Sequence, residues 1–254
     1  MTEREICGVL PVNKPAGMTS HDVVFKIRKL YGTKKVGHTG TLDPDATGLL
    51  IVLIGRAAKA AEYVTAGKKV YRAGLRLGIT TDTEDTTGKT LTESDDIPEK
   101  EEVFRSVESF RGDIMQVPPM YSALKVNGQK LCDLARKGIV IEREARPVTV
   151  YSIEADGCGK DYTLDVACSA GTYIRTLCAD IGAKLGCGGA MSSLFRTETG
   201  GFHISAAHTL AEIESLTQEE RDALLVPTES LFEDFGKVAL PAFYERLAKN
   251  GAEI

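Results

Sequence analysis

Residues 37–54 are GHTGTLDPDATGLLIVLI, a polar segment followed by an unbroken apolar run. The run 49–54 is short enough for a strand and ends at Gly55, which predicts a strand buried on both faces. The polar segment holds three glycines and a proline, which excludes a helix there. Because a residue before proline favours an extended backbone, Asp43 is predicted to lie on a constrained loop beside a rigid strand. Enzymes place nucleophiles and bases in such positions.

The residues of this loop alone leave other interpretations open. Asp-Pro in a glycine-rich stretch is also typical of an ordinary turn. A phosphate-binding P-loop is excluded because no Gly-Lys-Ser/Thr follows the glycines. His38, Asp43 and Asp45 carry metal-ligating groups, but no second His or Cys stands nearby at ligand spacing, so we predict no metal site.

The same string resembles the catalytic motif of the TruB-type tRNA pseudouridine synthases, a family that isomerises the uridine at position 55 of the tRNA T-loop. The resemblance continues in the family's order as far as about Arg196. The further matching segments are NKPAGMTS (13–20), KVYR (69–72), FRGD (110–113), PMYSALK (119–125), REARP (143–147), GTYIR (171–175) and LFR (194–196). A match of this extent is far more specific than one motif.

The resemblance implies a role for several residues of this chain. Asp43 would be the catalytic carboxylate, with Arg175 holding it oriented and charged. Tyr71 would stack on the target base and accept a proton from the sugar, and His38 would fill the gap left by the flipped nucleotide. The remaining substrate contacts implied by the resemblance are Tyr173, Leu194 and Lys14. Without the resemblance, a core tyrosine is the more common interpretation of Tyr71, and a turn histidine is the favoured interpretation of His38.

The implied reaction is an isomerisation within one nucleotide. Breaking the N1–C1′ bond, turning the base and joining C5 to C1′ adds and removes no group overall, so no cofactor is predicted. The expected partner is the T-arm loop of tRNA. Three alternatives remain: a pseudouridine synthase for another RNA, an RNA-binding protein that has kept only the fold, and a magnesium-dependent nuclease using Asp43 and Asp45.

The 254-residue composition is that of an ordinary soluble globular protein. No apolar run approaches the roughly 18 residues that span a bilayer. The N-terminus lacks the basic block and the apolar block of a signal peptide. The six cysteines form no Cys-x-x-Cys pair, which favours reduced thiols in a cytoplasmic protein. We expect a monomer with no obligatory protein partner and no membrane association.

The formal net charge of −5 at first argues against a nucleic-acid partner. Nine carboxylates and two lysines stand in the segment 82–102, however, so the rest of the chain carries a small positive charge. Local fields matter more than the net charge, and an RNA-binding surface therefore remains open. Clusters of basic residues lie at 26–35, 68–76, 125–137 and 143–146.

Periodicity and turn residues predict the remaining elements. Ser20 and Thr172 are the predicted N-caps of two helices, and the acidic stretch 80–97 is expected to be a mobile loop. Arg175 lies in the first helical turn, where a cation opposes the helix dipole, so a carboxylate partner is expected and Asp43 is the natural candidate. Strands are predicted over 6–12, 69–78, 147–155, 162–169 and 191–199, and helices over 20–31, 56–66, 98–110, 130–137, 172–186 and 209–216.

We predict one α/β catalytic domain of the α+β type, over residues 1–235. A mixed, largely antiparallel sheet is expected at its centre, flanked by helices, in the pseudouridine synthase fold. The segment 116–137 is expected to be a mobile insertion whose Tyr121, Lys125, Lys130, Arg136 and Lys137 contact RNA. Residues 236–254 resemble the beginning of a PUA-like RNA-binding domain and are expected to be an incomplete remnant of it.

Overall fold

The computed structural model describes residues 6–61, 67–126, 128–232, 236 and 238–252. A large mixed sheet runs through the molecule in the order β14-β1-β3-β12-β4-β11-β10-β7, with β2 added to β3 and β13 to β12. Its pairs are antiparallel except β1–β14 and β3–β12, which confirms the predicted fold class. Its strands are β1 (Gly8–Lys14), β2 (Val36–Thr39), β3 (Thr47–Ile54), β4 (Lys69–Leu77), β7 (Gly112–Gln116), β10 (Arg146–Cys158), β11 (Asp161–Cys168), β12 (Gly189–Thr199), β13 (Phe202–His203) and β14 (His208–Thr209).

Helices and two small hairpins complete the described chain. The α-helices are α1 (Ser20–Tyr31), α3 (Lys100–Glu108), α4 (Leu131–Ala135), α5 (Ile174–Lys184), α6 (Leu210–Ser215), α7 (Gln218–Ala223) and α8 (Ala242–Lys249). The 3-10 helices are η1 (Gly55–Ala60), η2 (Ile204–Ala206) and η3 (Thr228–Phe232). The hairpins pair β5 (Ile79–Thr81) with β6 (Thr90–Glu93) and β8 (Lys125–Val126) with β9 (Gln129–Lys130). None of the described helices is long and apolar enough to cross a bilayer.

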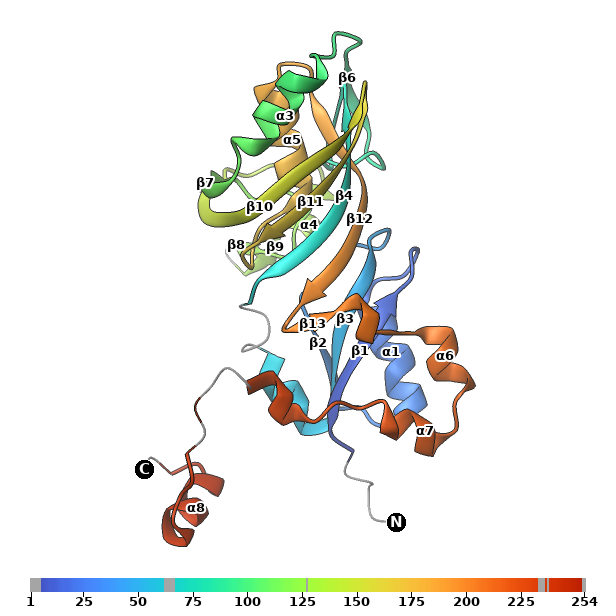
Figure 1. Cartoon of the computed structure of the whole chain (residues 1–254), viewed down its shortest axis with the longest axis vertical. Helices are drawn as coiled ribbons and strands as arrows, with labels where there is room; N and C mark the ends of the chain where they lie inside the picture. The colour runs from blue at the N-terminus through green and yellow to red at the C-terminus, as the bar shows by residue number, and fades with distance from the viewer. Residues whose placement is uncertain (1–5, 62–66, 127, 233–235, 237, 253–254) are drawn as a thin grey trace.

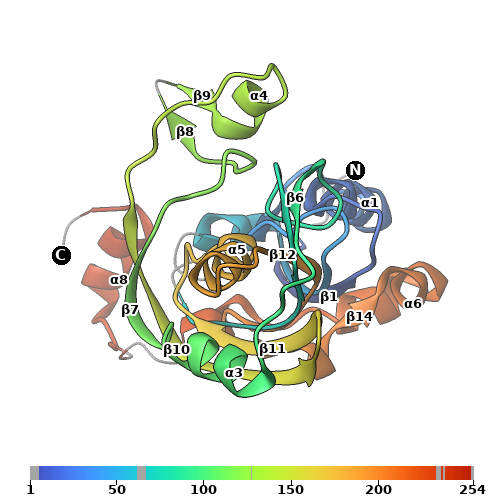
Figure 2. The ribbon, with the colours of Figure 1, turned by 90° about the horizontal axis from the view of Figure 1, so that it is seen from above.

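The molecule has two lobes along its long axis (Figure 1). The first lobe holds β1, β2 and β3 with α1 packed on them, and its core includes Leu10, Val24 and Val52. In the second lobe α3 and α5 cover one face of β4, β10, β11 and β12, around a core that includes Leu75 and Leu177. Seen from above, this sheet curves around α5 (Figure 2).

The two lobes meet where β3 runs parallel to β12. The contact is short: Thr47 pairs with Phe195 and Gly48 with Arg196. Gly48 has φ of +99°, and a Cβ at this position would lie 2.4 Å from the carbonyl oxygen of Arg196. Only glycine therefore permits this approach of the two backbones. The loop that carries Asp43 enters β3 directly at this junction.

Two predicted helix caps are wrong by one residue. The cap of α1 is Thr19, whose side chain accepts a hydrogen bond from the Asp22 amide in a capping box, whereas Ser20 is buried. The cap of α5 is Tyr173, and the hydroxyl of Thr172 instead donates to the Ser169 carbonyl. In both cases the predicted residue can cap, but a neighbour occupies the cap position.

The acidic stretch is not the unstructured loop that was expected. The stretch contains the short β5–β6 hairpin. Its strands are only three and four residues long, so they show no periodicity from which a hairpin could be predicted. The connection between them is pinned to β12, where the amide of Thr86 donates to Met191 O and the amide of Met191 donates to Glu84 O. A second correction concerns the predicted helix 56–66: the chain forms the 3-10 helix η1, and residues 62–66 lie outside the described residues.

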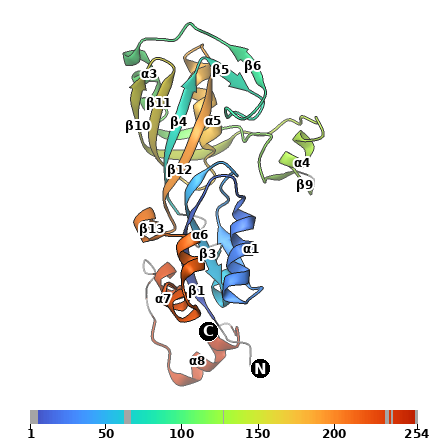
Figure 3. The same ribbon diagram turned by 90° about the vertical axis from the view of Figure 1, so that its right-hand side faces the viewer.

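Two segments stand away from the lobes. The hairpin β8–β9 and α4 project from the second lobe in Figures 2 and 3, in the segment where a mobile insertion and a short helix were predicted. Helix α8 lies beyond the first lobe in Figures 1 and 3, and none of its residues is buried. Phe243 and Tyr244 on α8 are 60% and 48% exposed.

Candidate active site

Hydrogen bonds hold the residues on either side of Asp43 in place. Leu42 is buried in the core of the second lobe, and its amide donates to Ser20 Oγ, which in turn donates to the Leu42 carbonyl. The carbonyl of Pro44 accepts from the Gly17 amide at 3.0 Å and from Lys14 Nζ at 2.9 Å. The backbone of Asp43 is thus held between two anchored neighbours, which fits the constrained loop predicted from Asp-Pro.

Lys14 lies beneath this loop and is fully buried. Its ammonium donates to the carbonyl oxygens of Pro15, Met18 and Pro44 at 2.8, 2.6 and 2.9 Å. Burial lowers the pKa of Lys14, while Asp45 and Asp43 oppose that effect. The three protons of the ammonium are therefore used to hold the loop, and direct contact of Lys14 with substrate stays a prediction.

The predicted pairing of Asp43 with Arg175 is confirmed. Arg175 Nε lies 3.1 Å from Asp43 Oδ2, and the side chains of Arg175 and Asp43 are 8% and 44% exposed. The guanidinium is thus buried while the carboxylate faces the surface beside it. Since Arg175 lies in the first turn of α5, the carboxylate also offsets the unfavourable helix dipole.

Arg175 is held by three further groups besides Asp43. Its Nη1 donates to Thr83 O at 3.1 Å and lies 3.7 Å from Asp85 Oδ2, and its Nη2 donates to Tyr121 O at 2.8 Å. Asp85 stands among many carboxylates in the acidic stretch, and no local signal distinguishes it from them. The connection between β5 and β6 is therefore part of the site.

The carboxylate of Glu84, next to Asp85, also contacts α5. It adopts φ of +65°, a conformation that costs a non-glycine residue energy, and its carboxylate accepts from Thr176 Oγ1 at 2.5 Å. Burial raises the pKa of Glu84, and the bonds to Thr176 and the charge of Arg175 oppose that rise. The strained backbone lets neighbouring acidic residues face Thr176 and Arg175 from one turn.

Tyr71 is buried on β4, as the alternation of that strand predicted. It packs in the core of the second lobe together with Leu42 from the Asp43 loop. Burial raises the pKa of Tyr71, while the nearby Arg196 guanidinium lowers it. The effect of burial on the pKa is the larger of the two, so the side chain of Tyr71 is a neutral phenol. It can accept a proton only as its own proton leaves.

His38 lies on β2, opposite Val52 of β3, and is half-buried. Its Nδ1 is buried and has no hydrogen-bond partner among the described residues. Burial, with help from the charges of Arg196 and His21, lowers the pKa of His38, so the ring is neutral near pH 7. Its role in filling the place of a flipped nucleotide stays a prediction.

Tyr173 and Leu194 are both half-buried. Leu194 packs against the core that contains Tyr71, whereas Tyr173 borders a separate hollow of about 230 Å³ beside Gln116. The Tyr173 amide donates to Gln116 Oε1 and its carbonyl accepts from Gln116 Nε2, which fixes the start of α5. Sequence reasoning missed Gln116, because nothing in its neighbourhood marks a glutamine that caps a distant helix.

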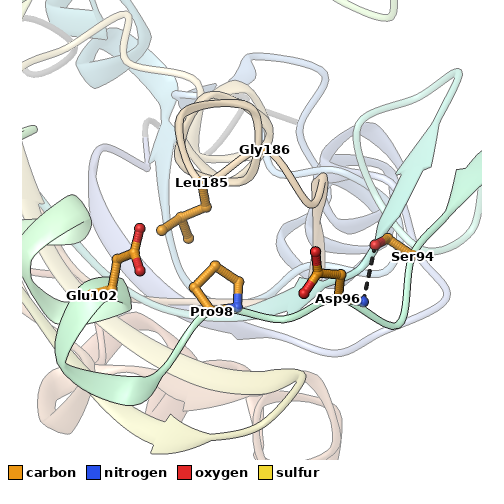
Figure 4. Close-up of a pocket in the computed structure, with 6 residues that line it drawn as sticks. All are labelled: Ser94, Asp96, Pro98, Glu102, Leu185 and Gly186. Carbon is orange, nitrogen blue, oxygen red and sulfur yellow. Dashed lines mark hydrogen bonds between the residues drawn. The ribbon is translucent and has the colours of Figure 1, made fainter.

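Another hollow, of about 370 Å³, lies at the opposite end of α5 from Arg175 (Figure 4). Its lining includes the carboxylates of Asp96 and Glu102, beside Leu185 and Gly186. None of the predicted site residues lines it, and its negative charge disfavours RNA. Among the described residues, no group of three or more His, Cys, Asp or Glu side chains comes together as a metal site would require.

Comparisons with known proteins show which family the chain resembles. The model of the TruB family pseudouridylate synthase N-terminal domain matches residues 28–174, and that of the tRNA pseudouridylate synthase B C-terminal domain matches residues 175–233. The chain is 47% identical to a tRNA pseudouridine synthase B of Alkaliphilus oremlandii and 46% identical to one of Clostridium kluyveri. Each alignment covers 97% of this chain, with 82% and 85% of the relatives.

Solved structures extend the likeness to three dimensions. A Cbf5-Nop10-Gar1 complex contains a chain with a TM-score of 0.76 and 30% identity, over 97% of this chain and 68% of that one. An H/ACA RNP bound to a substrate RNA containing 2′-deoxyuridine gives a TM-score of 0.66 and 28% identity, over 89% of this chain and 61% of that one. On the family models and the relatives' identity over nearly its whole length, the chain belongs to the TruB family of pseudouridylate synthases.

Proposed function

We propose that this protein converts uridine to pseudouridine at position 55, in the T-loop of tRNA. The observation that carries the proposal is the Asp43–Arg175 pair on an anchored loop at the junction of the two lobes. Relatives named tRNA pseudouridine synthase B support tRNA as the substrate class. The position within the T-loop rests on the sequence motifs that resemble this family.

Asp43 is presented as a nucleophile rather than as a proton donor. Arg175 binds Oδ2, and no contact of Oδ1 with a described residue competes with an incoming reactant. The guanidinium orients the carboxylate and fixes its direction of approach. In the reaction the N1–C1′ bond breaks, C5 bonds to C1′, C5 loses its proton to solvent and N1 ends protonated, so no cofactor is needed.

The target base must leave the RNA stack to reach Asp43, at a cost of a few kcal/mol. We assign Tyr71 to stacking on the extruded base and to proton transfer, and His38 to the gap in the RNA. Leu194 and Tyr173 line the place of the base, while Lys14 holds the loop beneath it. A magnesium nuclease fits less well, because a cation from the protein already pairs with Asp43.

We propose that residues 1–235 form the catalytic unit and that 236–254 belong to a separate RNA-binding unit. The exposed Phe243 and Tyr244 of α8 support the second part, since stacking platforms for RNA are aromatic. The projecting segment with β8, β9 and α4 would grip the RNA backbone through Lys125, Lys130, Arg136 and Lys137, which are exposed. The six cysteines are unpaired, which supports a reducing cytoplasm, and we propose that the protein acts as a monomer.

The test measures tritium released from a tRNA transcript labelled at uridine C5, with a chelator present. Two controls run alongside: a transcript with cytidine in place of the T-loop target uridine, and an unrelated structured RNA. Release from the first transcript alone is the expected result. Release from the other RNAs would overturn the assigned position, and loss of release on chelation would favour the nuclease class.

A further inference from the structure

Glu84 has a backbone conformation that is unusual for its residue type. Its φ is +65°, and no other non-glycine residue among those that the structure describes has a positive φ. In this left-handed region the Cβ crowds the backbone, so glycine is favoured and a glutamate is strained. Glu84 stands between Thr83 and Asp85, which both contact Arg175. Strain of this kind persists only where surrounding contacts fix the residue.

Contacts on two sides hold Glu84 in this conformation. Its carbonyl accepts from the Met191 amide of β12 at 3.0 Å, and its carboxylate accepts from Thr176 Oγ1 of α5 at 2.5 Å. Thr176 is buried, so loss of the carboxylate would leave a buried hydroxyl without this acceptor. Residues 83–86, called the acidic turn below, are therefore attached both to β12 and to α5.

A carboxylate at this place is also poorly solvated. Burial raises the pKa of Glu84, and the charge of Asp180 on α5 raises it further. The hydrogen bond from Thr176 opposes this rise, as do the charges of Arg175 and Arg143. Backbone strain and loss of solvation thus fall on one residue, and the bond to Thr176 is the largest of the effects that offset the burial.

The acidic turn contacts α5 at two consecutive residues, Arg175 and Thr176. Glu84 binds Thr176, while Thr83 O and Asp85 Oδ2 lie 3.1 and 3.7 Å from Arg175 Nη1. Loss of the first contact would let the second shift, because one short turn carries both. The place of the Arg175 guanidinium therefore depends on how firmly this turn is held against the helix.

We propose that Glu84 is a positioning residue of the catalytic site: its bond to Thr176 holds the acidic turn against α5 and thereby fixes the Arg175 guanidinium that orients Asp43. The inference rests on the proposed function and adds to it a residue that acts through another. The positive φ permits this arrangement. In an extended strand Glu84 and Asp85 would point to opposite faces, whereas here both side chains reach α5.

The experiment separates the backbone of residue 84 from its side chain. Glu84→Gly removes the carboxylate and relieves the strain, whereas Glu84→Gln keeps an oxygen that accepts from Thr176. Thr176→Val removes the donor and Thr176→Ser keeps it. Lys89→Gly is the matched control, because Lys89 is an exposed residue of the same connection and its amide, not its side chain, contacts Asp82.

Three quantities are measured for each variant: turnover by tritium release, the Tm, and hydrogen exchange of Arg175 Nε–H by NMR. The Nε–H resonance is assigned by its disappearance in Arg175→Lys. Exchange at this proton reports how firmly the guanidinium is held, and it is measured in the free protein without RNA.

We expect Glu84→Gly and Thr176→Val each to lower kcat about 10-fold with little change in KM, since the guanidinium is misplaced while the RNA contacts remain. The Tm of Glu84→Gly should stay close to that of the wild type, because relief of strain offsets the lost bond. Arg175 Nε–H should exchange about 10-fold faster in both variants. Glu84→Gln, Thr176→Ser and Lys89→Gly should resemble the wild type. The double variant Glu84→Gly/Thr176→Val should be no slower than either single variant, because both changes remove one bond.

Unchanged kcat and unchanged exchange in Glu84→Gly would overturn the proposal, and so would a loss of kcat without faster exchange at Arg175. Equal losses in Lys89→Gly would show that any added flexibility in the connection has this effect, which would also overturn it. If the wild type forms no pseudouridine, the proposed function fails, whereas exchange at Arg175 still tests the role of Glu84.

Discussion

Arg175 Nε lies 3.1 Å from Asp43 Oδ2, and the two residues come from different lobes of the molecule. Asp43 belongs to the loop that enters β3, while Arg175 stands in the first turn of α5. The contact therefore exists only when the lobes are joined through β3 and β12. The ion pair of Asp43 with Arg175 thus depends on the junction of the two lobes.

Replacing Asp43 by Asn should abolish turnover, by at least about a thousand-fold, because the amide is neither charged nor nucleophilic. The shape of the side chain is kept, so tRNA binding should change little. Tritium release and filter binding measure the two effects separately. Retained pseudouridine formation would refute the assignment of Asp43 as nucleophile.

Replacing Asp85 by Asn should lower kcat about 10-fold with little change in KM. Asp85 lies 3.7 Å from Arg175 Nη1 and its side chain is 17% exposed, so its charge helps to fix the guanidinium. Glu93→Gln is the matched control, since Glu93 is an exposed carboxylate of the same acidic stretch. Equal effects of both substitutions on kcat would show that only the general negative charge matters.

Replacing Tyr71 by Phe should keep stacking on the base but lower kcat about 100-fold, because the hydroxyl for proton transfer is lost. RNA affinity should stay within about two-fold of the wild type. Tyr162→Phe is the control: its hydroxyl is buried without a hydrogen-bond partner among the described residues, so its loss should be nearly neutral. Wild-type turnover in Tyr71→Phe would exclude a chemical role for that hydroxyl.

Replacing Lys14 by Met should lower the free energy of unfolding by about 2–4 kcal/mol, because three carbonyls lose a charged donor. Turnover of the folded fraction should also fall, since the Pro44 carbonyl is no longer held. Denaturant titration and kinetics measure the two effects. Lys26→Met, which removes an exposed pair with Glu214, should cost less than about 1 kcal/mol.

The stability of the wild type should decline as the pH falls below about 6.5, with a contribution from His38. Burial lowers the pKa of His38, so below that pH the unfolded chain binds a proton that the folded protein does not take up. Unfolding is then favoured by acid, and stability rises with pH across this window. His38→Gln should flatten the pH dependence of Tm, whereas the exposed His203→Gln should not. An unchanged slope in His38→Gln would exclude this contribution.

Local pattern predicted much of the architecture. The run 49–54 forms the core of β3, and the alternation of 69–78 places Tyr71, Ala73, Leu75 and Leu77 inside, because strand geometry sends successive side chains to opposite faces. The caps of α1 and α5 were misplaced by one residue, since Ser20 and Thr172 have the chemistry of caps. The β5–β6 hairpin was missed because its strands are too short to show a period.

The sequence by itself determined the constrained Asp43 loop, the buried strand after it, the need of Arg175 for a carboxylate partner and, through its motifs, the TruB family. Only the tertiary structure selected Asp85 from the carboxylates around it, joined Lys14 to Pro44 and set Lys69 beside Arg196. The physical reason is that periodicity and turn chemistry act over a few residues. Pairing of buried charges depends instead on which groups the packed lobes bring within hydrogen-bond distance.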